Sequence, residues 1–427
     1  MFVDCGRSPG LLIKILSTAI VLWTLPTFAD QRTPLTLAEA EDLALVAEPG
    51  RAALLSRSEA FAEQAVAAGQ LPDPMLRVGL ANYPVSDGSF SSEPMTQAQL
   101  GIRQVFPRSR TRSLGTEKFE AMAAEAQDSA LAREREVLEA TRMAWLEIYY
   151  WQRARATVSD SRPFFEDLVA VTRSLYSVGR KSQADVLRAE LELSRLDDRL
   201  IESDRSAAEA QARLSRWLGA DAYRPLAMKL PDWQSLPTLD DLQAALAGHP
   251  ALEAADAGID ARQTAVDLAE QSKKPAWALD LGYGYRDGYN ANGEPRSDFV
   301  SLIVSVDLPF FQKNRQDRHL AAALRERSAA IDTKAELNAR LSSQLGVEYA
   351  RWQDLTRRIE LYEQRILGQS ETRAEAAMLA YQSDAGDFAD VMRAAIDDLN
   401  TRLDHIRLKV ERAKSYATLA NLGGLQR

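Results

Sequence analysis

The residues that could carry chemistry in this sequence are scattered, and their spacing does not assemble a reactive centre. His249, His319 and His405 are isolated, with no second histidine or cysteine at i+3 or i+4 to complete a metal site. Met75 and Met95 could act as soft metal ligands, but methionine more often fills gaps in packing. The sequence also has no glycine-rich phosphate loop and no G-x-S-x-G motif. We therefore expect no enzymatic activity, no cofactor and no resident metal ion.

The charged residues form a mixed pattern that is typical of solvated helix faces. Carboxylates lie among basic residues at helical spacing, and charged residues make up 26% of the chain. Aromatic residues are only 7%, and long stretches rich in Ala, Leu, Glu and Arg favour long helices. The formal net charge of −9 argues against a nucleic-acid partner, which would require a basic face.

The first 29 residues have the pattern of a secretory signal peptide. Arg7 and Lys14 are followed by a short apolar run at 15–25 and by small residues up to Ala29. The run is too short for a membrane anchor, which needs roughly 20 apolar residues. Cys5 precedes the run, so we expect the mature chain to carry no cysteine and no lipid on Cys5.

The sequence contains a long internal duplication. Pro49 and Pro74 are 25 residues apart, as are Pro250 and Pro275, and an alternating apolar segment follows the second proline of each pair. Further along each half, Tyr and Asp occur nine residues apart in a similar motif, as Tyr176 and Asp185, then as Tyr381 and Asp390. We predict a first repeat at 36–219, a linker at 220–237 and a second repeat at 238–424.

Each repeat is predicted to contain two strands of about 9–11 residues. Apolar side chains alternate with polar residues or glycine in 276–286 and 300–308, and also around 76–81 and 99–103. This length and pattern suit strands that cross a bilayer, although a half-buried soluble hairpin would alternate in the same way. The export signal favours the membrane. Four strands cannot close a barrel, so three copies would have to contribute about twelve strands.

The strands are predicted to be followed by very long helices. From Arg110 to Tyr176 only Pro163 interrupts the helical pattern, and from Lys313 to Tyr381 there is no proline. At ~1.5 Å per residue each helix would be ~100 Å long. Turns at Gly179 and Gly386 would lead into the return helices 184–218 and 388–420, whose heptad-like apolar spacing indicates coiled-coil packing.

Together the signal peptide, the two repeats, the paired strands, the long hairpins and the duplicated Tyr-x8-Asp motif resemble the TolC family over about 36–424. The resemblance implies a mostly α fold with a small β part, in which a trimeric α-helical barrel joins a shared 12-stranded β-barrel. It also implies a homotrimer in outer-membrane lipid, with a long periplasmic extension. The expected partners are a periplasmic adaptor (membrane fusion) protein and an inner-membrane pump, in a tripartite efflux system.

The resemblance assigns candidate gate residues at the helical tip of the second repeat. In the family this tip carries an acidic ring at the narrowest point, and Asp390 matches one of its aspartates. The family's second acidic position is Arg393 here, so Asp384 and Asp387 could supply the negative charge instead, with Tyr381 beside them. Alternatively, Asp390 is a helix-surface charge that pairs with Arg393 at i+3.

The same resemblance gives candidate adaptor contacts at the two tips, namely Tyr176, Gly179, Asp185 and Gly386. Structural roles compete with these assignments. We expect Tyr176 and Tyr381 to pack beneath their turns, and Gly179 and Gly386 to form the turns.

The predicted cargo is heavy-metal cations, moved by a resistance-nodulation-division pump. Pro72 to Met75 and Gln104 to Pro107 are similar to the heavy-metal-efflux branch of the family, although the lipoprotein cysteine of that branch is missing. A type I protein-secretion channel or a multidrug channel would share the fold. A periplasmic helical adaptor or scaffold is a further alternative, and an adaptor should show a single hairpin flanked by β-domains.

Overall fold

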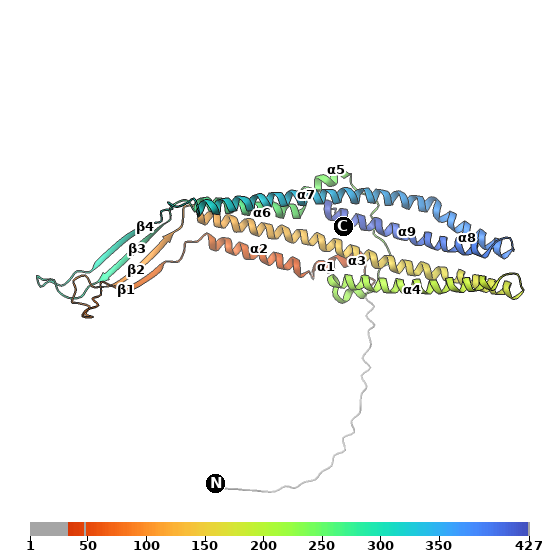
Figure 1. The fold of residues 1–427 in the computed structure, drawn as a ribbon, viewed down its shortest axis with the longest axis horizontal. Coiled ribbons are helices and arrows are strands. Elements are labelled where there is room, and N and C mark those ends of the chain that lie inside the picture. Colours follow the sequence, from red (N-terminus) through yellow and green to blue (C-terminus); the bar gives the residue numbers. More distant parts are fainter. Residues whose placement is uncertain (1–32, 47, 426–427) are drawn as a thin grey trace, which may run out of the picture.

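The computed structural model describes residues 33–46 and 48–425, which form an elongated molecule (Figure 1). The strands gather at one end, the helices run along the long axis, and two helical hairpin turns lie at the opposite end (Figure 1). The predicted signal peptide at 1–29, with Cys5, lies outside the described residues.

The helices and strands follow one order twice. The first half contains α1 (Leu37–Val46), α2 (Pro49–Ala68), β1 (Met75–Ala81), β2 (Gln97–Phe106), α3 (Thr111–Ser177), α4 (Gln183–Leu218) and the short 3₁₀ helix η1 (Gly219–Tyr223). The second contains α5 (Leu239–Leu246), α6 (Pro250–Gln271), β3 (Trp277–Tyr285), β4 (Phe299–Val306), α7 (Gln316–Leu361), the π-helical segment η2 (Tyr362–Ile366), α8 (Leu367–Gln382) and α9 (Phe388–Gly423). The boundaries proposed for the repeats and the linker stay predictions.

The long helices differ from expectation in where they are irregular. The expected interruption at Pro163 is wrong, because α3 is one helix of 67 residues that contains this proline. Proline costs a helix one hydrogen bond, but Phe165 and Leu168 just beyond it are buried in a hydrophobic cluster that holds the helix in place. The proline-free helix of the second half instead contains η2, a local widening of the helix between α7 and α8.

The four strands form one antiparallel sheet in the order β1-β2-β3-β4. β2 pairs with β3 over nine positions, from Ala98–Tyr285 to Phe106–Trp277, so the two halves of the chain share the sheet. β1 and β4 are its edges. The strands are 7, 10, 9 and 8 residues long, so β1 and β4 are shorter than predicted.

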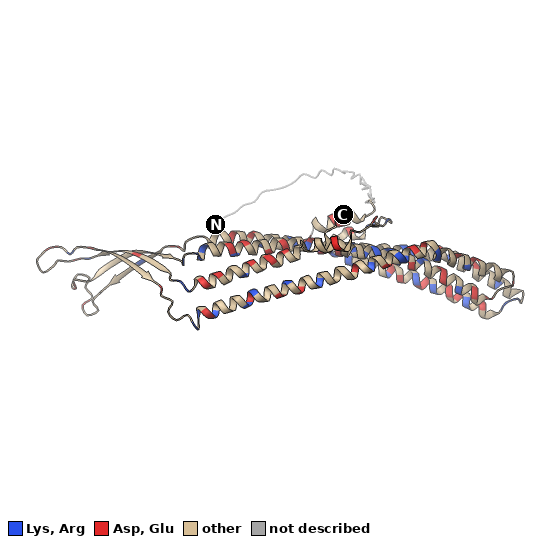
Figure 2. Cartoon of the chain, turned by 90° about the horizontal axis from the view of Figure 1, so that it is seen from above, with Lys and Arg blue, Asp and Glu red and all other residues tan. Residues whose placement is uncertain are grey.

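One face of this sheet is almost wholly apolar and is exposed in the single chain. Opposite residues in antiparallel strands share a face, and the register aligns Val78, Leu100, Tyr283 and Val300 across the four strands. All four side chains are exposed. Figure 2 shows that charged residues are interspersed along the helices and are sparse on the strands.

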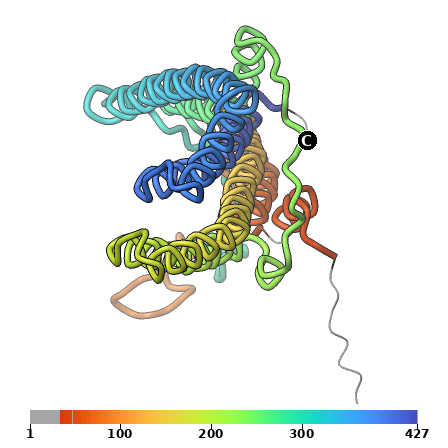
Figure 3. The backbone as a smooth tube through the Cα atoms, turned by 90° about the vertical axis from the view of Figure 1, so that its right-hand side faces the viewer, coloured from red at the N-terminus to blue at the C-terminus, as the bar shows by residue number. Residues whose placement is uncertain are grey.

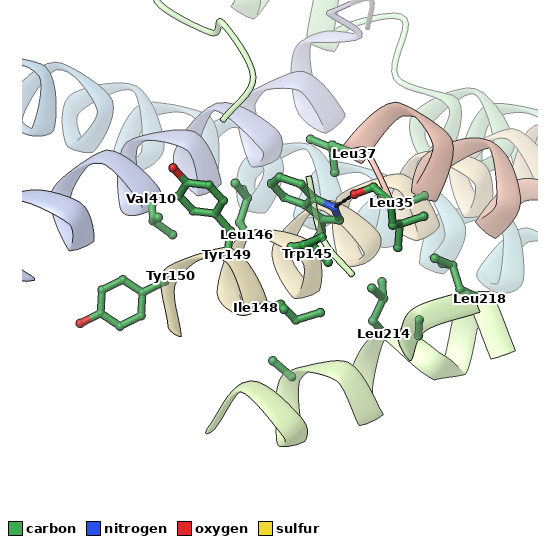
Figure 4. Packing of buried hydrophobic residues seen from close by; sticks show 14 of the residues in the cluster. Leu35, Leu37, Trp145, Leu146, Ile148, Tyr149, Tyr150, Leu214, Leu218 and Val410 are labelled. Atoms are coloured by element: carbon green, nitrogen blue, oxygen red, sulfur yellow. Dashed lines mark hydrogen bonds between the residues drawn. The ribbon is translucent and has the colours of Figure 1, made fainter. Parts of the chain in front are cut away.

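The main hydrophobic core lies halfway along the helical part, where the two halves meet (Figure 4). Trp145, Leu146 and Ile148 of α3 are fully buried there. They pack with residues of α1, α4 and α9, including Leu37, Leu214 and Val410. The Trp145 Nε1 donates a hydrogen bond to the Leu35 carbonyl oxygen at 3.3 Å.

The two hairpins, α3–α4 and α7/α8–α9, extend from this core to the tips. Viewed end-on, the helices trace a curved layer with one concave side (Figure 3). α3 packs against α9, and a second hydrophobic cluster joins the hairpins near the tips. We call the two turns the first tip (residues 178–182) and the second tip (residues 383–387).

Candidate functional site at the helical tips

Both tips end their helices with the same hydrogen-bonded turn. At the first tip, the Gly179 N–H donates to the Tyr176 carbonyl and the Arg180 N–H donates to the Leu175 carbonyl, both at 2.9 Å. At the second tip, the Asp384 N–H donates to the Tyr381 carbonyl at 3.1 Å, and a matching bond joins residues 385 and 380. This is the Schellman arrangement, in which one residue adopts a left-handed conformation.

The left-handed residue differs between the tips. Gly179 has φ +74°, as predicted for a turn glycine, whereas at the second tip Asp384 has φ +62°. Gly386 lies in the turn without a positive φ. Its reason for being glycine is a close approach, since a Cβ there would lie 3.1 Å from the Cβ of Ala380. Gly386 therefore lies in the turn as expected, while Asp384 holds the left-handed position in it.

The return helices start in different ways. Ser182 caps α4 in a capping box, where its Oγ accepts from the Asp185 N–H at 3.3 Å and the Asp185 carboxylate accepts from Ser182. Asp387 occupies the equivalent N-cap of α9, but its side chain makes no capping hydrogen bond. The Asp185 carboxylate therefore stabilises the start of its own helix, α4.

Asp390 is more accessible than Asp384, whose side chain is 42% exposed. The Asp390 side chain is 66% exposed, and its Oδ1 lies 2.9 Å from the Nη1 of Arg393, one turn along the helix. Asp185, at the same position of the first tip, is only 18% exposed in its side chain. Asp390 is therefore exposed on the helix surface and makes the i+3 pair that the alternative interpretation predicted, and its gate role stays a prediction.

The two copies of the Tyr-x8-Asp motif place their tyrosines differently. Tyr381 is fully buried, packs edge-on against Phe388 at 5.8 Å between ring centres, and donates a weak hydrogen bond to the Thr172 Oγ1 at 3.4 Å. Tyr176 is 46% exposed. Packing beneath the turn is therefore correct for Tyr381 and wrong for Tyr176, which the structure leaves at the surface near the first tip.

An ion-pair cluster joins the two tips within one chain. The Asp384 carboxylate lies 2.9 Å from the Arg180 Nη2 and 3.1 Å from the Lys181 Nζ. The Lys181 Nζ also lies 4.9 Å from the centre of the Tyr381 ring, which adds a cation–π contact. Hydrogen bonds from Lys181 and then Arg180 lower the pKa of Asp384 below its ordinary value, so the carboxylate is held charged.

Arg180 and Lys181 were missed as functional candidates in the sequence. A signal was present, because these two cations follow Gly179 directly and Asp384 occupies the position equivalent to Gly179 in the duplicated motif. The pairing itself depends on how the two hairpins align, and residues 180 and 384 are 204 positions apart.

Two broader searches concern membranes and metals. Within the described residues, no helix combines the length and apolar character needed to cross a membrane. Nor do the described parts of the chain bring three or more His, Cys, Asp or Glu side chains into a group suited to a metal ion.

Comparison with known proteins gives similarities of three kinds. Residues 242–425 match the family model described as outer membrane efflux protein. The protein CyaE of Bordetella pertussis is 27% identical over 431 residues, covering 95% of this chain and 88% of CyaE.

The fold is similar to solved outer-membrane proteins at low sequence identity. The outer membrane protein VceC of Vibrio cholerae superposes with a TM-score of 0.75 at 19% identity, covering 91% of this chain and 96% of VceC. The CmeC outer membrane channel of Campylobacter jejuni gives 0.76 at 12% identity, covering 98% and 95%.

Proposed function

We propose that the chain is a member of the TolC family of outer membrane efflux proteins and that it acts as the outer-membrane channel of a tripartite efflux system and not as an enzyme. We infer that it lies in the outer membrane with a long periplasmic helical extension, as the matching family model and the shared fold support. The observation that carries the proposal is a short four-stranded sheet with an exposed apolar face at the end of a long helical rod.

The sheet supports a trimer as the working unit. A lone four-stranded sheet would leave the free backbone groups of β1 and β4 unpaired in lipid, at a cost of several kcal/mol for each group. Pairing β4 of one copy with β1 of the next removes both edges. Three copies would supply twelve strands, enough to enclose a water-filled lumen.

Exposed apolar residues on the helices support the same assembly. Leu187 and Leu191 of α4 belong to the heptad-like pattern, yet both are exposed in the single chain, while Leu196 is buried. Val347 of α7 and Leu379 of α8 are also exposed. Helices of this length need partners along their apolar positions, and neighbouring copies would provide them.

The tips would form the periplasmic end of the channel. Three copies would bring Asp390, Asp387 and Arg393 around a common opening, with the gate role assigned first to Asp390 because its side chain is 66% exposed. Tyr176 and Gly179 at the first tip are exposed and available to a periplasmic adaptor protein, which would connect the channel to an inner-membrane pump. The cluster of Arg180, Lys181 and Asp384 would hold the two tips of each copy together.

The cargo stays open. Heavy-metal cations remain a prediction from the sequence, alongside the multidrug and protein-secretion alternatives, because an inner-membrane pump would select what enters the channel. The adaptor alternative loses support, because an adaptor would have one hairpin between β-domains. This chain has two hairpins, and each half contributes two strands to one shared sheet.

Surface labelling of intact cells tests the orientation of the proposed channel. Cys5 is replaced by serine, and single cysteines are placed at Ser86, in the loop between β1 and β2, and at Ser177, near the first tip. A membrane-impermeant thiol reagent should label Ser86→Cys on intact cells and Ser177→Cys only after the outer membrane is permeabilised. Equal labelling of both sites on intact cells, or of neither, would contradict the proposal.

A further inference from the structure

The face of the sheet opposite the apolar one carries a small group of charges at mid-height. The register pairs Arg103 of β2 with Asp280 of β3. It pairs Arg77 of β1 with Gly101, which lies two residues from Arg103 along β2 and therefore on the same face. Every other strand position on this face is uncharged. In the proposed assembly, on which this inference rests, this face would line the lumen.

The three charged side chains form one cluster with an uncompensated positive charge. The Arg77 Nη1 lies 2.9 Å from the Asp280 Oδ1, and the Arg103 Nε lies 3.8 Å from the Asp280 Oδ2. The Asp280 side chain is only 10% exposed, whereas that of Arg77 is 62% exposed. One carboxylate is thus covered by two guanidinium groups, and the charge that reaches the open face is that of arginine.

Glycines leave space around this cluster. Gly79, Gly101 and Gly282 lie on the same face and have no side chain to fill it, and a Cβ at Gly79 would meet nothing within 4 Å. The resulting hollow is lined by polar groups that include Arg77, Gln99, Asp280 and Ser301. The Arg77 guanidinium group therefore projects beside open, polar space, whereas Arg103 is half-buried beside it.

We propose that Arg77, Arg103 and Asp280 form a positively charged belt in the channel lumen that favours anions over small cations. Each copy would contribute two arginines and one aspartate, so the trimer would hold six positive and three negative charges at one level. Rings of arginine or lysine make pores favour anions, since charges close together beside a low-dielectric wall act on ions that pass between them.

The loops 82–96 and 286–298, at the end of the sheet far from the helices, carry a net negative charge, opposite in sign to that of the belt. They lie at a distance from the belt. Asp280 and Arg286 are six residues apart, about 20 Å along a strand at ~3.3 Å per residue. This exceeds the Debye length of about 8 Å at physiological ionic strength, so the loop charges are largely screened at the belt. A belt of this sign also opposes free divalent cations, and it favours anionic or neutral cargo over the predicted heavy-metal cations.

Ion selectivity of the purified channel in planar lipid bilayers tests the belt. The zero-current potential is measured across a tenfold KCl gradient for the wild type, for R77Q/R103Q and for D280N. We expect the chloride-to-potassium permeability ratio to fall by about threefold or more from the wild type to R77Q/R103Q, because the acidic residues at the tips are the same in both. D280N should shift the ratio the other way. R286Q, at the loop end, is the matched control that removes an arginine and should change the ratio little.

The outcomes separate the belt from the channel itself. Conducting channels whose ratio is the same in the wild type, R77Q/R103Q and D280N would overturn the belt and leave the proposed function standing. A wild type that forms no channels would overturn both. If R77Q/R103Q does not assemble, the single R77Q variant decides, because its side chain is the more exposed of the two arginines and its loss should still lower the ratio.

Discussion

Asp384 and Arg180 join the turns of the two helical hairpins, with 2.9 Å between the Asp384 Oδ2 and the Arg180 Nη2. Lys181 completes the cluster from the other side of the carboxylate. Since the two partners are on different hairpins, the ion pairs act on the relative position of the tips and not on the folding of either helix.

Removing this link should loosen the tips without unfolding the chain. We expect D384N to raise the single-channel conductance in lipid bilayers, because the second tip is then free to move away from the first. R180A/K181A should have a similar effect, and combining it with D384N should add little, since both remove the same contacts. R195A is the matched control, because its ion pair with Glu192 stays within α4. Fully additive effects would contradict a shared link.

The same link predicts the pH dependence of the tips. The hydrogen bonds from Lys181 and Arg180 lower the pKa of Asp384 below its ordinary value of 3.8. A lowered pKa means that the link is fully present above the ordinary value and is lost as the pH falls through the lowered one. Conductance should therefore stay constant from neutral pH to about 4 and rise only below it. An increase near pH 6 that is absent in D384N would be inconsistent with this sign.

The two return helices should respond differently to loss of their N-cap side chains. S182A removes the Oγ that accepts from the Asp185 N–H, whereas the bond from the Ser182 backbone N–H to the Asp185 carboxylate stays, and it should destabilise the first turn of α4 by about 1 kcal/mol. D387A removes a side chain that makes no capping bond and should cost α9 less. Hydrogen exchange of the amides at 184–187 and 389–392 measures both. Equal loss of protection at the two sites would show that the capping box does not stabilise α4.

The two faces of β4 should tolerate charge unequally. Val304 lies on the apolar face and Ser305 on the polar one, although the residues are adjacent. V304R places a charge toward lipid, at a cost of about 2–4 kcal/mol near the bilayer centre, and should reduce the amount of assembled protein in outer membranes. S305R faces the proposed lumen and should assemble normally. Sucrose-gradient fractionation followed by immunoblotting compares them, and the opposite order would reverse the assignment of the faces.

Regular periodicity allowed much of the fold to be predicted. The alternation around Trp277 to Tyr285 located β3, and the proline-free and nearly proline-free stretches located the long helices. Local patterns could not show that α3 continues through Pro163, because the packing of Phe165 and Leu168 that stabilises it comes from other elements. The π-helical segment η2 likewise had no sequence signal that separates it from ordinary helix.

The tip residues were located correctly along the chain, but their surroundings could not be predicted. Tyr176 and Tyr381 occupy the same position of a duplicated motif, yet one is exposed and the other is buried between hairpins. Arg180 and Asp384 were likewise brought together by the alignment of two hairpins that the sequence does not specify. Gate and adaptor-contact roles at these residues stay predictions.

The mass of the protein extracted from outer membranes in mild detergent tests the central claim most directly. We predict that the protein fractionates with outer membranes and, once corrected for bound detergent, has the mass of three chains, as a barrel shared by three copies requires. A monomer released with the periplasmic contents would contradict the account, because its exposed apolar sheet face and unpaired strand edges would then have no lipid or neighbouring copy to cover them.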